Sequence, residues 1–277
     1  SNYFASKAED SGMDIPAPLG LSYLPYQKAG IAFGLKNPGV LIADEPGLGK
    51  TIQAIGIINA DPTMQHVLVV CPASLKNNWY RELKKWLLPR DHAHGKLPDD
   101  LQWRSQVNQS RYTWSYDKKT GDVCHETIDL TPPVVVISGM CQDKAAAQKL
   151  FNTAIVVINY DLLVSYIDII LQCNWDMVIA DECHVLRNPE TQRTQNLIGD
   201  AENAMPPIPA TRRVFLTGTP ILNKAKDVWA LVSYLNPSIW SSYEDFAERF
   251  CQKDKGASGA NDSGSSNLGE LQKMLRG

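Results

Sequence analysis

The sequence has little net charge, no apolar run of membrane-spanning length and no signal peptide pattern. Its 277 residues carry 27 basic and 30 acidic side chains, which gives a net charge of −3 and a pI near 6.0. Without a global basic field, nucleic acid can bind only at a local patch. The apolar runs fall short of the roughly 18 residues of a transmembrane helix, and the N-terminus is polar. We therefore expect no membrane partner and no DNA binding driven by overall charge.

The six cysteines lack the spacing of a metal site or of a disulfide framework. They are scattered along the chain, at Cys71, Cys124, Cys141, Cys173, Cys183 and Cys251. Cys124 adjoins His125, but no second pair follows at a spacing typical of zinc sites. Scattered cysteines of this kind are typical of reduced, mostly buried thiols. We therefore expect an intracellular protein.

The sequence does contain a regular alternation of short apolar runs and helical segments. Hydrophobic residues make up 44% and charged residues 21% of the chain, as in an ordinary globular protein. Apolar runs rich in β-branched residues recur at 40–43, 67–70, 134–137, 155–158, 177–180 and 214–216. Segments with helical character follow most of them, at 51–59, 75–87, 162–171, 227–235 and 243–250. This order predicts an α/β fold with a mostly parallel sheet covered by helices on both faces.

The first apolar run breaks into a glycine loop that ends in Lys-Thr. Gly47, Leu48 and Gly49 form the turn, in which backbone N–H groups are free to face an anion. Lys50 can reach terminal phosphates and the Thr51 hydroxyl can ligate Mg²⁺. The general pattern begins with a glycine where this chain has Asp44, so an unrelated turn stays an alternative on these residues alone.

A second apolar run, at 177–180, ends directly in two carboxylates. Ligands of open α/β sheets bind at the carboxyl ends of the strands. Asp181 is therefore placed to hold Mg²⁺ and Glu182 to polarise an attacking water. Taken alone, the pair could also be solvated loop acids or a helix N-cap.

Together these two segments resemble superfamily-two helicases, and in particular their Swi/Snf-type, DNA-translocating branch. Residues 181–184 read Asp-Glu-Cys-His, similar to the acidic box of that superfamily. Residues 44–51 resemble the branch's phosphate loop, which usually has Asp where other families have the first Gly. The resemblance implies a RecA-like P-loop lobe. Within the branch, the chain resembles the annealing-helicase-like subgroup most.

Further stretches match the same branch in order. The resemblance implies that Gln27 reads adenine and that Lys76, Asn77 and Tyr160 contact the nucleic-acid backbone. It also implies that Thr217 and Thr219 couple hydrolysis to movement, with His184 as a catalytic relay between the γ-phosphate and these hydroxyls. From the residues alone, His184 could be a surface histidine, and Lys76 and Asn77 solvated residues at a helix start.

The expected organisation is an N-terminal tail at 1–20 and a helicase ATP-binding RecA-like lobe at 21–277. An insertion at 89–133 breaks the α/β rhythm, and residues 256–267 form a flexible loop by composition. Within the insertion, alternating aromatics at 112–116 and a turn before 123–128 predict a hairpin. Its aromatic face could stack bases or could pack on the lobe. The resemblance also extends to residues 268–276, as the helix before a crossing to a second motor lobe.

We expect an ATP hydrolase: an ATP- and Mg²⁺-binding motor lobe of a double-stranded-DNA translocase or helicase-like protein. The family's second RecA-like lobe, with its arginine fingers, is expected to be absent from this chain. Nucleotide would then be bound but hydrolysed slowly, and the duplex would bind weakly without the two-lobe cleft. Two other classes stay open: a single-strand DNA or RNA helicase lobe, and a non-enzymatic nucleotide-binding docking module.

Overall fold

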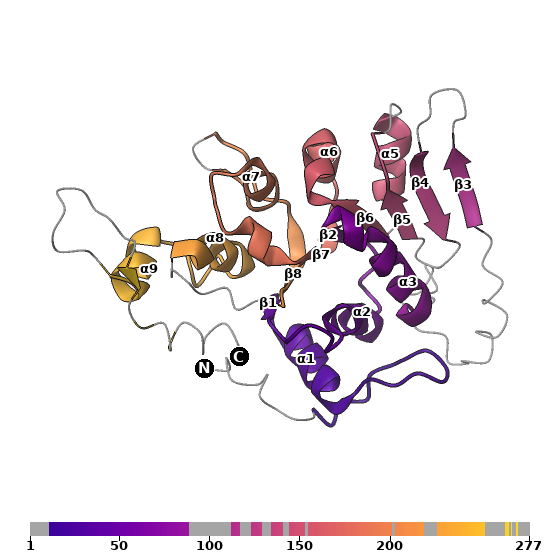
Figure 1. Cartoon of the computed structure of the whole chain (residues 1–277), viewed down its shortest axis with the longest axis horizontal. Helices are drawn as coiled ribbons and strands as arrows, with labels where there is room; N and C mark the ends of the chain where they lie inside the picture. Colours follow the sequence, from indigo (N-terminus) through magenta and orange to yellow (C-terminus); the bar gives the residue numbers. More distant parts are fainter. Residues whose placement is uncertain are drawn as a thin grey trace.

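The computed structural model describes residues 11–88, 112–116, 123–128, 134–140, 144–152, 155–200, 203–218, 226–252, 264–265, 267 and 270. All structural statements below concern these residues. The described chain is built on one large sheet with helices on both sides (Figure 1).

Six consecutive strands of the sheet are parallel, as the sequence predicts. They lie in the order β1 (Gly39–Ile42), β8 (Ala210–Leu216), β7 (Trp175–Asp181), β2 (Val67–Cys71), β6 (Ile155–Asn159) and β5 (Val134–Ile137). Each predicted apolar run forms one of these strands. Most of their residues are buried because helices cover both faces of the sheet, and the exceptions are mainly the first four residues of β8.

The predicted hairpin extends this sheet at its β5 edge. Strand β4 (Val123–Ile128) pairs antiparallel with β5 and with β3 (Tyr112–Tyr116). The hairpin is therefore confirmed; the structure describes the backbone of 112–116 without its aromatic side chains, so base stacking stays a prediction. The bounds of the insertion at 89–133 likewise stay a prediction.

The helices form two layers. On one face lie α1 (Pro25–Lys36), α2 (Lys50–Ala60) and α3 (Lys76–Trp86), the last preceded by η2 (Ala73–Leu75); on the other lie α5 (Lys144–Phe151), α6 (Leu163–Ile170), α7 (Gln192–Ile198) and α8 (Lys226–Leu235) (Figure 1). Two short helices, η4 (Tyr160–Leu162) and η5 (Cys183–Leu186), follow β6 and β7, and α9 (Tyr243–Phe250) follows α8.

Alternate residues of one strand face the two layers. In β2, Leu68 and Val70 belong to the core beneath α5 to α9, whereas Val67 and Val69 belong to the core beneath α1 to α3. This is the two-residue period of a strand buried on both sides.

The C-terminal region contains a short two-stranded ribbon. The ribbon pairs β9 (Cys251–Gln252) with β10 (Gly264–Ser265), so two residues of the predicted flexible loop at 256–267 are paired. The rest of that loop, most of the predicted helix at 268–276, and half of the predicted tail lie outside the described residues. Within the described part of the chain, none of the helices combines the length and hydropathy needed to cross a bilayer.

The parallel register brings the segments that carry the predicted site to one edge of the sheet. Leu216 at the end of β8 pairs with Ile42 on one side and with Asp181 on the other. The next strand continues the row, since β2 pairs with β7 up to Val70 and Ala180. The glycine loop follows β1, Thr217 follows β8, and the acidic pair lies at the end of β7. All three therefore lie at the ends of consecutive strands.

Candidate functional site

The glycine loop joins the end of β1 to the start of α2. Gly47 and Gly49 have φ angles of 89° and 77°, in the left-handed region that favours glycine. Gly49 is the N-cap of α2, so the first N–H groups of that helix point toward the loop. A glycine loop followed by a helix N-terminus is suited to binding an anion.

Lys50 lies back across this loop. Its Nζ donates hydrogen bonds to the carbonyl oxygens of Asp44, at 2.9 Å, and of Glu45, at 3.1 Å. The segment after β8 is close by, because a Cβ added to Gly218 would lie 3.5 Å from Lys50 Nζ and 3.1 Å from Pro46 Cγ. The ammonium group is thus held between the loop and the segment that begins with Thr217.

Asp44 stands where most phosphate loops have glycine, and in the structure its side chain has a hydrogen-bond partner. Its Oδ2 accepts a hydrogen bond of 2.6 Å from Nε2 of Gln53 on α2. Gln53 is buried, and its Oε1 lies 2.0 Å from where a Cβ of Gly30 would be, so α1 approaches closely there. The carboxylate therefore ties the start of the loop to α2.

Gln27 is joined to the other end of the loop. Its Nε2 donates to the Leu48 carbonyl oxygen at 3.2 Å, and its Oε1 accepts from the Leu24 backbone N–H at 3.0 Å. A Cβ at position 49 would lie only 2.5 Å from Gln27 Nε2, so Gly49 is required for this contact. The predicted adenine-reading residue and the predicted phosphate loop thus form one unit.

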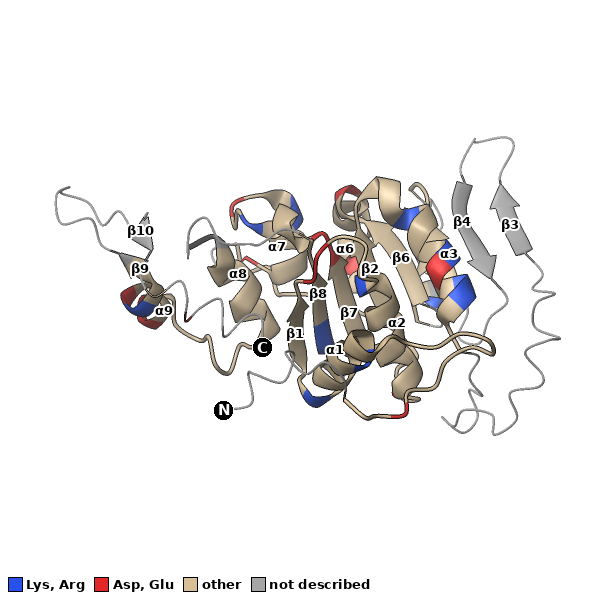
Figure 2. Ribbon diagram, turned by 60° about the horizontal axis from the view of Figure 1, so that its bottom comes forward, with Lys and Arg blue, Asp and Glu red and all other residues tan. Residues whose placement is uncertain are grey.

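Asp181 ends β7 as a buried carboxylate with several donors around it. Its Oδ2 accepts from the Trp79 indole Nε1 at 2.8 Å, and its Oδ1 accepts from the Glu182 backbone N–H at 2.9 Å. Its carbonyl oxygen accepts from the Tyr160 hydroxyl at 2.8 Å. In Figure 2, acidic residues (red) lie where β7 and β8 end.

Burial raises the pKa of Asp181 above its ordinary value, and the nearby charge of Glu182 raises it further. The Trp79 and Glu182 hydrogen bonds and the charge of Lys50 act in the opposite direction on this pKa. Lys50 belongs to the loop after β1 and Asp181 ends β7, and both strands pair with β8, so the two groups lie at the same end of the sheet.

Glu182 adopts an unusual backbone conformation beside Asp181. Its φ is 51°, in the left-handed region that non-glycine residues rarely adopt, and such strain concentrates at functional sites. Its Oε2 lies 3.1 Å from Nδ1 of His184, an ion-pair distance when the imidazole is protonated. Nδ1 of His184 is itself buried, so the Glu182 carboxylate is its neighbour at this site.

The residues predicted to contact nucleic acid or to couple hydrolysis to movement differ in their accessibility. Asn77 is exposed at the start of α3, whereas Tyr160 is only 4% exposed, since its hydroxyl points inward to Asp181. Thr217 is fully buried, and its N–H donates to the Ile42 carbonyl oxygen at 3.1 Å. Thr219 lies outside the described residues.

Lys76 makes internal contacts in this structure. Its Nζ donates to the Ile137 carbonyl oxygen at 2.8 Å and to Asn159 Oδ1 at 3.0 Å. Burial lowers the pKa of Lys76. Its ammonium group therefore ties α3 to the ends of β5 and β6, and a backbone phosphate would have to compete with these contacts.

Two residues at the site were not identified from the sequence. The sequence pattern places Trp79 only within the helical segment 75–87, and it gives Gln53 no role. A signal exists for each: a buried carboxylate at a strand end needs a donor, and an Asp in place of a loop glycine needs a partner. Neither signal names the partner, because both contacts join segments that are separated in the sequence.

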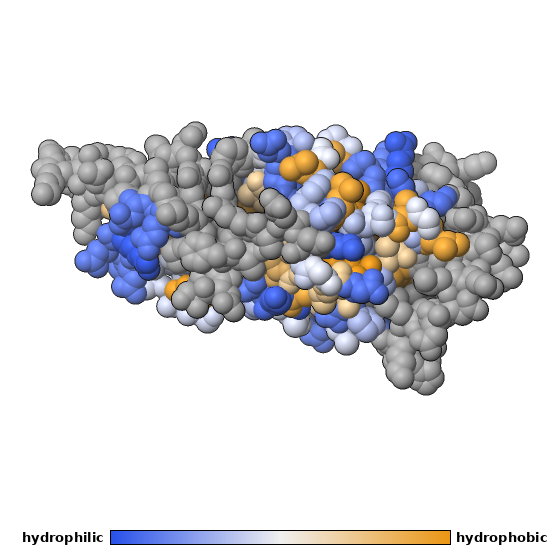
Figure 3. Space-filling view, turned by 90° about the horizontal axis from the view of Figure 1, so that it is seen from below, coloured by the Kyte–Doolittle hydropathy of each residue, from blue (hydrophilic) through white to orange (hydrophobic). Residues whose placement is uncertain are grey.

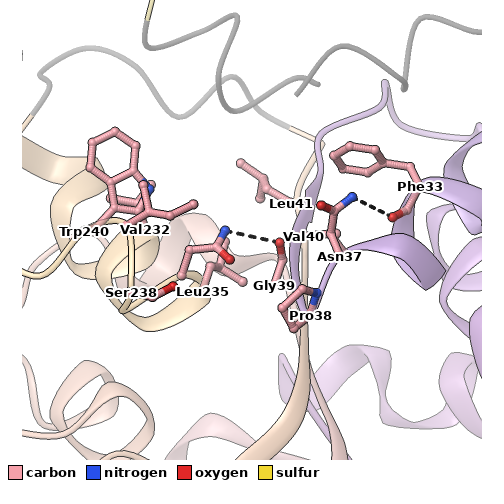
Figure 4. Close-up of a pocket in the computed structure, with 12 residues that line it drawn as sticks. Phe33, Asn37, Pro38, Gly39, Val40, Leu41, Val232, Leu235, Ser238 and Trp240 are labelled. Atoms are coloured by element: carbon pink, nitrogen blue, oxygen red, sulfur yellow. Dashed lines mark hydrogen bonds between the residues drawn. The ribbon is translucent and has the colours of Figure 1, made fainter. Parts of the chain in front are cut away.

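Two grooves lie outside this site. One, of about 260 Å³, runs along the free edge of β1 between α1 and α8, and is lined by residues such as Phe33, Val40 and Trp240 (Figure 4). The other, of about 500 Å³, lies between α6 and α7 and contains the ion pair of Asp161 with Arg193, at 3.0 Å. Tyr160 lines the second groove.

The residues at the sheet edge fit a nucleoside triphosphate with a divalent metal. The loop supplies glycines with positive φ, a helix N-terminus and an ammonium group for phosphates. The carboxylate of Asp181 and the hydroxyl of Thr51 are oxygen ligands of the kind Mg²⁺ prefers. Glu182 and His184, whose Oε2 and Nδ1 atoms lie 3.1 Å apart, follow Asp181 within three residues and add polar groups there.

Comparison with known proteins agrees with this geometry. A family profile for the SNF2-related domain matches residues 26–276. The human DNA annealing helicase and endonuclease ZRANB3 is 28% identical over 270 residues, which cover 94% of this chain and 20% of that protein. A RAD54-like DNA repair and recombination protein of Drosophila persimilis is 28% identical over 243 residues, covering 82% of this chain and 26% of that protein. The chain thus spans about a fifth to a quarter of the length of these relatives.

The fold matches a solved structure as well. The Sulfolobus solfataricus SWI2/SNF2 ATPase core in complex with dsDNA superposes with a TM-score of 0.60 at 23% identity, covering 95% of this chain and 45% of that one. The six parallel strands and flanking helices are therefore the fold of a SWI2/SNF2 ATPase core. Because the profile match extends over nearly the whole sequence, the chain belongs to the SNF2-related domain family.

Proposed function

We propose that this chain is an ATP-binding and ATP-hydrolysing motor lobe of a translocase that moves along double-stranded DNA. The observation that carries the proposal is that the loop of Lys50 and the Asp181–Glu182 pair follow β1 and β7, the two strands that flank β8, so both lie at the same end of the sheet. A phosphate-binding loop and a metal-binding carboxylate at one site are what phosphoryl transfer requires.

The roles of the nucleotide-binding residues follow from their positions. Gly47, Leu48 and Gly49 would hold the phosphates through backbone N–H groups, and Lys50 would exchange its bonds to the loop carbonyls for the β- and γ-phosphates. Thr51 and Asp181 would hold Mg²⁺, which supplies charge neutralisation at the phosphates when bound.

Gln27 would select adenine. Its amide is already fixed against the loop, and exposed hydrophobic side chains flank it, with Leu24 50% and Leu48 37% exposed. Seen from the α1 side, the described surface carries hydrophobic residues (orange) among hydrophilic ones (Figure 3). Such a surface beside a directed amide suits a flat base with a polar edge.

Glu182 would orient the attacking water; it directly follows the end of β7, in a left-handed backbone conformation. His184 contacts Glu182 through Nδ1, and its other ring nitrogen, Nε2, would reach the γ-phosphate or the segment after Leu216. Thr217 and Thr219 would then pass the change at the γ-phosphate to the rest of the motor.

The proposed partners are duplex DNA and a second RecA-like lobe. The solved Sulfolobus core is described as bound to dsDNA, and this chain covers 45% of it. In P-loop ATPases arginine fingers contribute on the order of 10³ to 10⁵ in rate. We therefore propose that the 277-residue chain alone binds ATP or ADP but hydrolyses ATP slowly, with weak DNA stimulation.

The proposal is tested by titrating the chain with a fluorescent ATP analogue and Mg²⁺. Lys50→Ala should abolish binding because the ammonium group is lost, whereas Lys36→Ala, an exposed lysine at the end of α1, should bind as the wild type does. Equal binding by wild type and Lys50→Ala would refute the site.

The DNA substrate is tested in a protein that carries both lobes. Duplex DNA should stimulate its ATP hydrolysis more than single-stranded DNA or RNA of the same length. Stimulation by single strands alone would make it a single-strand or RNA helicase. Nucleotide binding without hydrolysis in the two-lobe protein would make it a docking module.

A further inference from the structure

Trp79 connects α3, the first α-helix after β2, to the carboxylate of Asp181. The indole is completely buried, lies on α3 one turn from the helix start, and donates from Nε1 to Oδ2 of Asp181 at 2.8 Å. The hydrogen bond joins residues 102 positions apart in the sequence. An entirely apolar side chain would fill this buried position equally well. The indole differs from it by its N–H group, and that group has a specific partner in Asp181.

The two oxygens of Asp181 are held by different donors. Oδ1 accepts from the Glu182 backbone N–H and Oδ2 accepts from Trp79, so the plane of the carboxylate is fixed from both sides. An ionised carboxylate has about four lone-pair positions. Each oxygen therefore keeps capacity for a further partner, in an orientation that the two donors define.

The first residue of α3 is held by hydrogen bonds, and the two residues that follow it are exposed. Lys76 ties the first residue of α3 to the ends of β5 and β6, while Asn77 and Asn78 next to it are exposed. A partner that contacts these exposed residues would act on a helix whose next turn holds Asp181. This makes α3 a short mechanical link between the surface and the carboxylate.

We propose that Trp79 is a positioning residue that orients Asp181 for Mg²⁺ and links it to the exposed start of α3. This inference rests on the proposed nucleotide site. Trp79 touches neither nucleotide nor metal; it acts through the carboxylate, as the outer hydrogen-bond partners of metal ligands do.

The test is the Mg²⁺ dependence of nucleotide binding. Trp79→Phe keeps an aromatic ring but removes the N–H donor. Trp175→Phe is the matched control, because Trp175 is also buried and donates its Nε1 to the Ile170 carbonyl oxygen at 3.0 Å, in the core on the other face of the sheet. Both variants lose one buried indole hydrogen bond, so a general packing defect affects both.

In EDTA, a fluorescent ADP analogue should bind to the wild type and both variants with the same affinity. On adding Mg²⁺, Trp79→Phe should need about 10- to 100-fold more metal for the half-maximal change, the range found for outer partners of metal ligands. Trp175→Phe should match the wild type. The same Mg²⁺ midpoint in all three proteins would overturn the proposal.

A second measurement does not depend on the variant folding. In the wild type with ¹⁵N-labelled tryptophan, Mn²⁺ with ADP should broaden one indole N–H signal at far lower metal concentration than the other indole signals. Uniform broadening of all indole signals would refute a tryptophan on the metal-holding carboxylate. If the wild type bound no nucleotide at all, the proposed function would fail; if it bound Mg²⁺–ADP but these two results were negative, only the role of Trp79 would.

Discussion

Two glycines of the phosphate loop allow backbone strain to be separated from steric contact. Gly47 and Gly49 both have positive φ, at 89° and 77°. A Cβ at position 47 would have nothing within 4 Å, whereas a Cβ at position 49 would lie 2.5 Å from Gln27 Nε2 and 3.3 Å from Ile52 Cδ1. Alanine at either position is destabilised by the left-handed backbone conformation, but only alanine at position 49 must also displace the Gln27 side chain.

The expected magnitudes follow from these contacts. A left-handed backbone costs an L-residue roughly 1–2 kcal/mol, which both variants share. Displacing Gln27 breaks its bonds to Leu24 and Leu48, each of which contributes about 0.5–1.5 kcal/mol. Gly49→Ala should therefore destabilise the protein by about 1–3 kcal/mol more than Gly47→Ala. For a domain near this size each kcal/mol lowers the Tm by roughly 2–4 °C.

The assay is thermal unfolding without nucleotide, followed by titration with adenine and guanine nucleotides. Gly49→Ala should show the lower Tm and should lose the preference for adenine, because Gln27 has moved; Gly47→Ala should keep the preference. In the double variant Gln27→Ala/Gly49→Ala the two destabilisations should be less than additive, since the second change removes the obstructing group. Equal Tm values for both single alanine variants, or full additivity in the double variant, would refute the reasoning.

Three further predictions follow. In a protein carrying both lobes, Glu182→Gln should retain ATP binding but lose hydrolysis, measured by phosphate release; unchanged turnover would exclude Glu182 as the water-orienting residue. Gln53→Ala should leave Asp44 without its donor and destabilise the fold by about 1–3 kcal/mol, measured by urea unfolding; an unchanged midpoint would contradict the contact. Burial raises the pKa of Cys71 from 9.0 to about 12 and of Cys173 to about 11. Their contribution to stability is therefore present below pH 9 and lost as the pH rises toward 11–12; a free energy of unfolding that is constant from pH 8 to 11 would refute it.

The order of elements was available from the sequence because it depends on local patterns. The six apolar runs and most of the predicted helices appear in the structure, since buried parallel strands require continuous β-branched segments. The hairpin at 112–128 was also predicted, because alternating residues around a turn have few other solutions. The glycine loop and the acidic pair were recognisable because their chemistry needs particular residues at short, fixed spacing.

The tertiary structure decided which partners these residues have. It placed the amide of Gln53 on Asp44, the indole of Trp79 on Asp181, and the ammonium group of Lys76 on Ile137 and Asn159. These contacts span 9 to 102 positions, and most join segments brought together only by the crossover connections of the sheet. A local pattern shows that a buried polar group needs a partner, but the partner itself is chosen by the packing of the helices on the strands. For this reason the sequence predicted the chemistry of the site, and only the fold showed which contacts hold its residues in place.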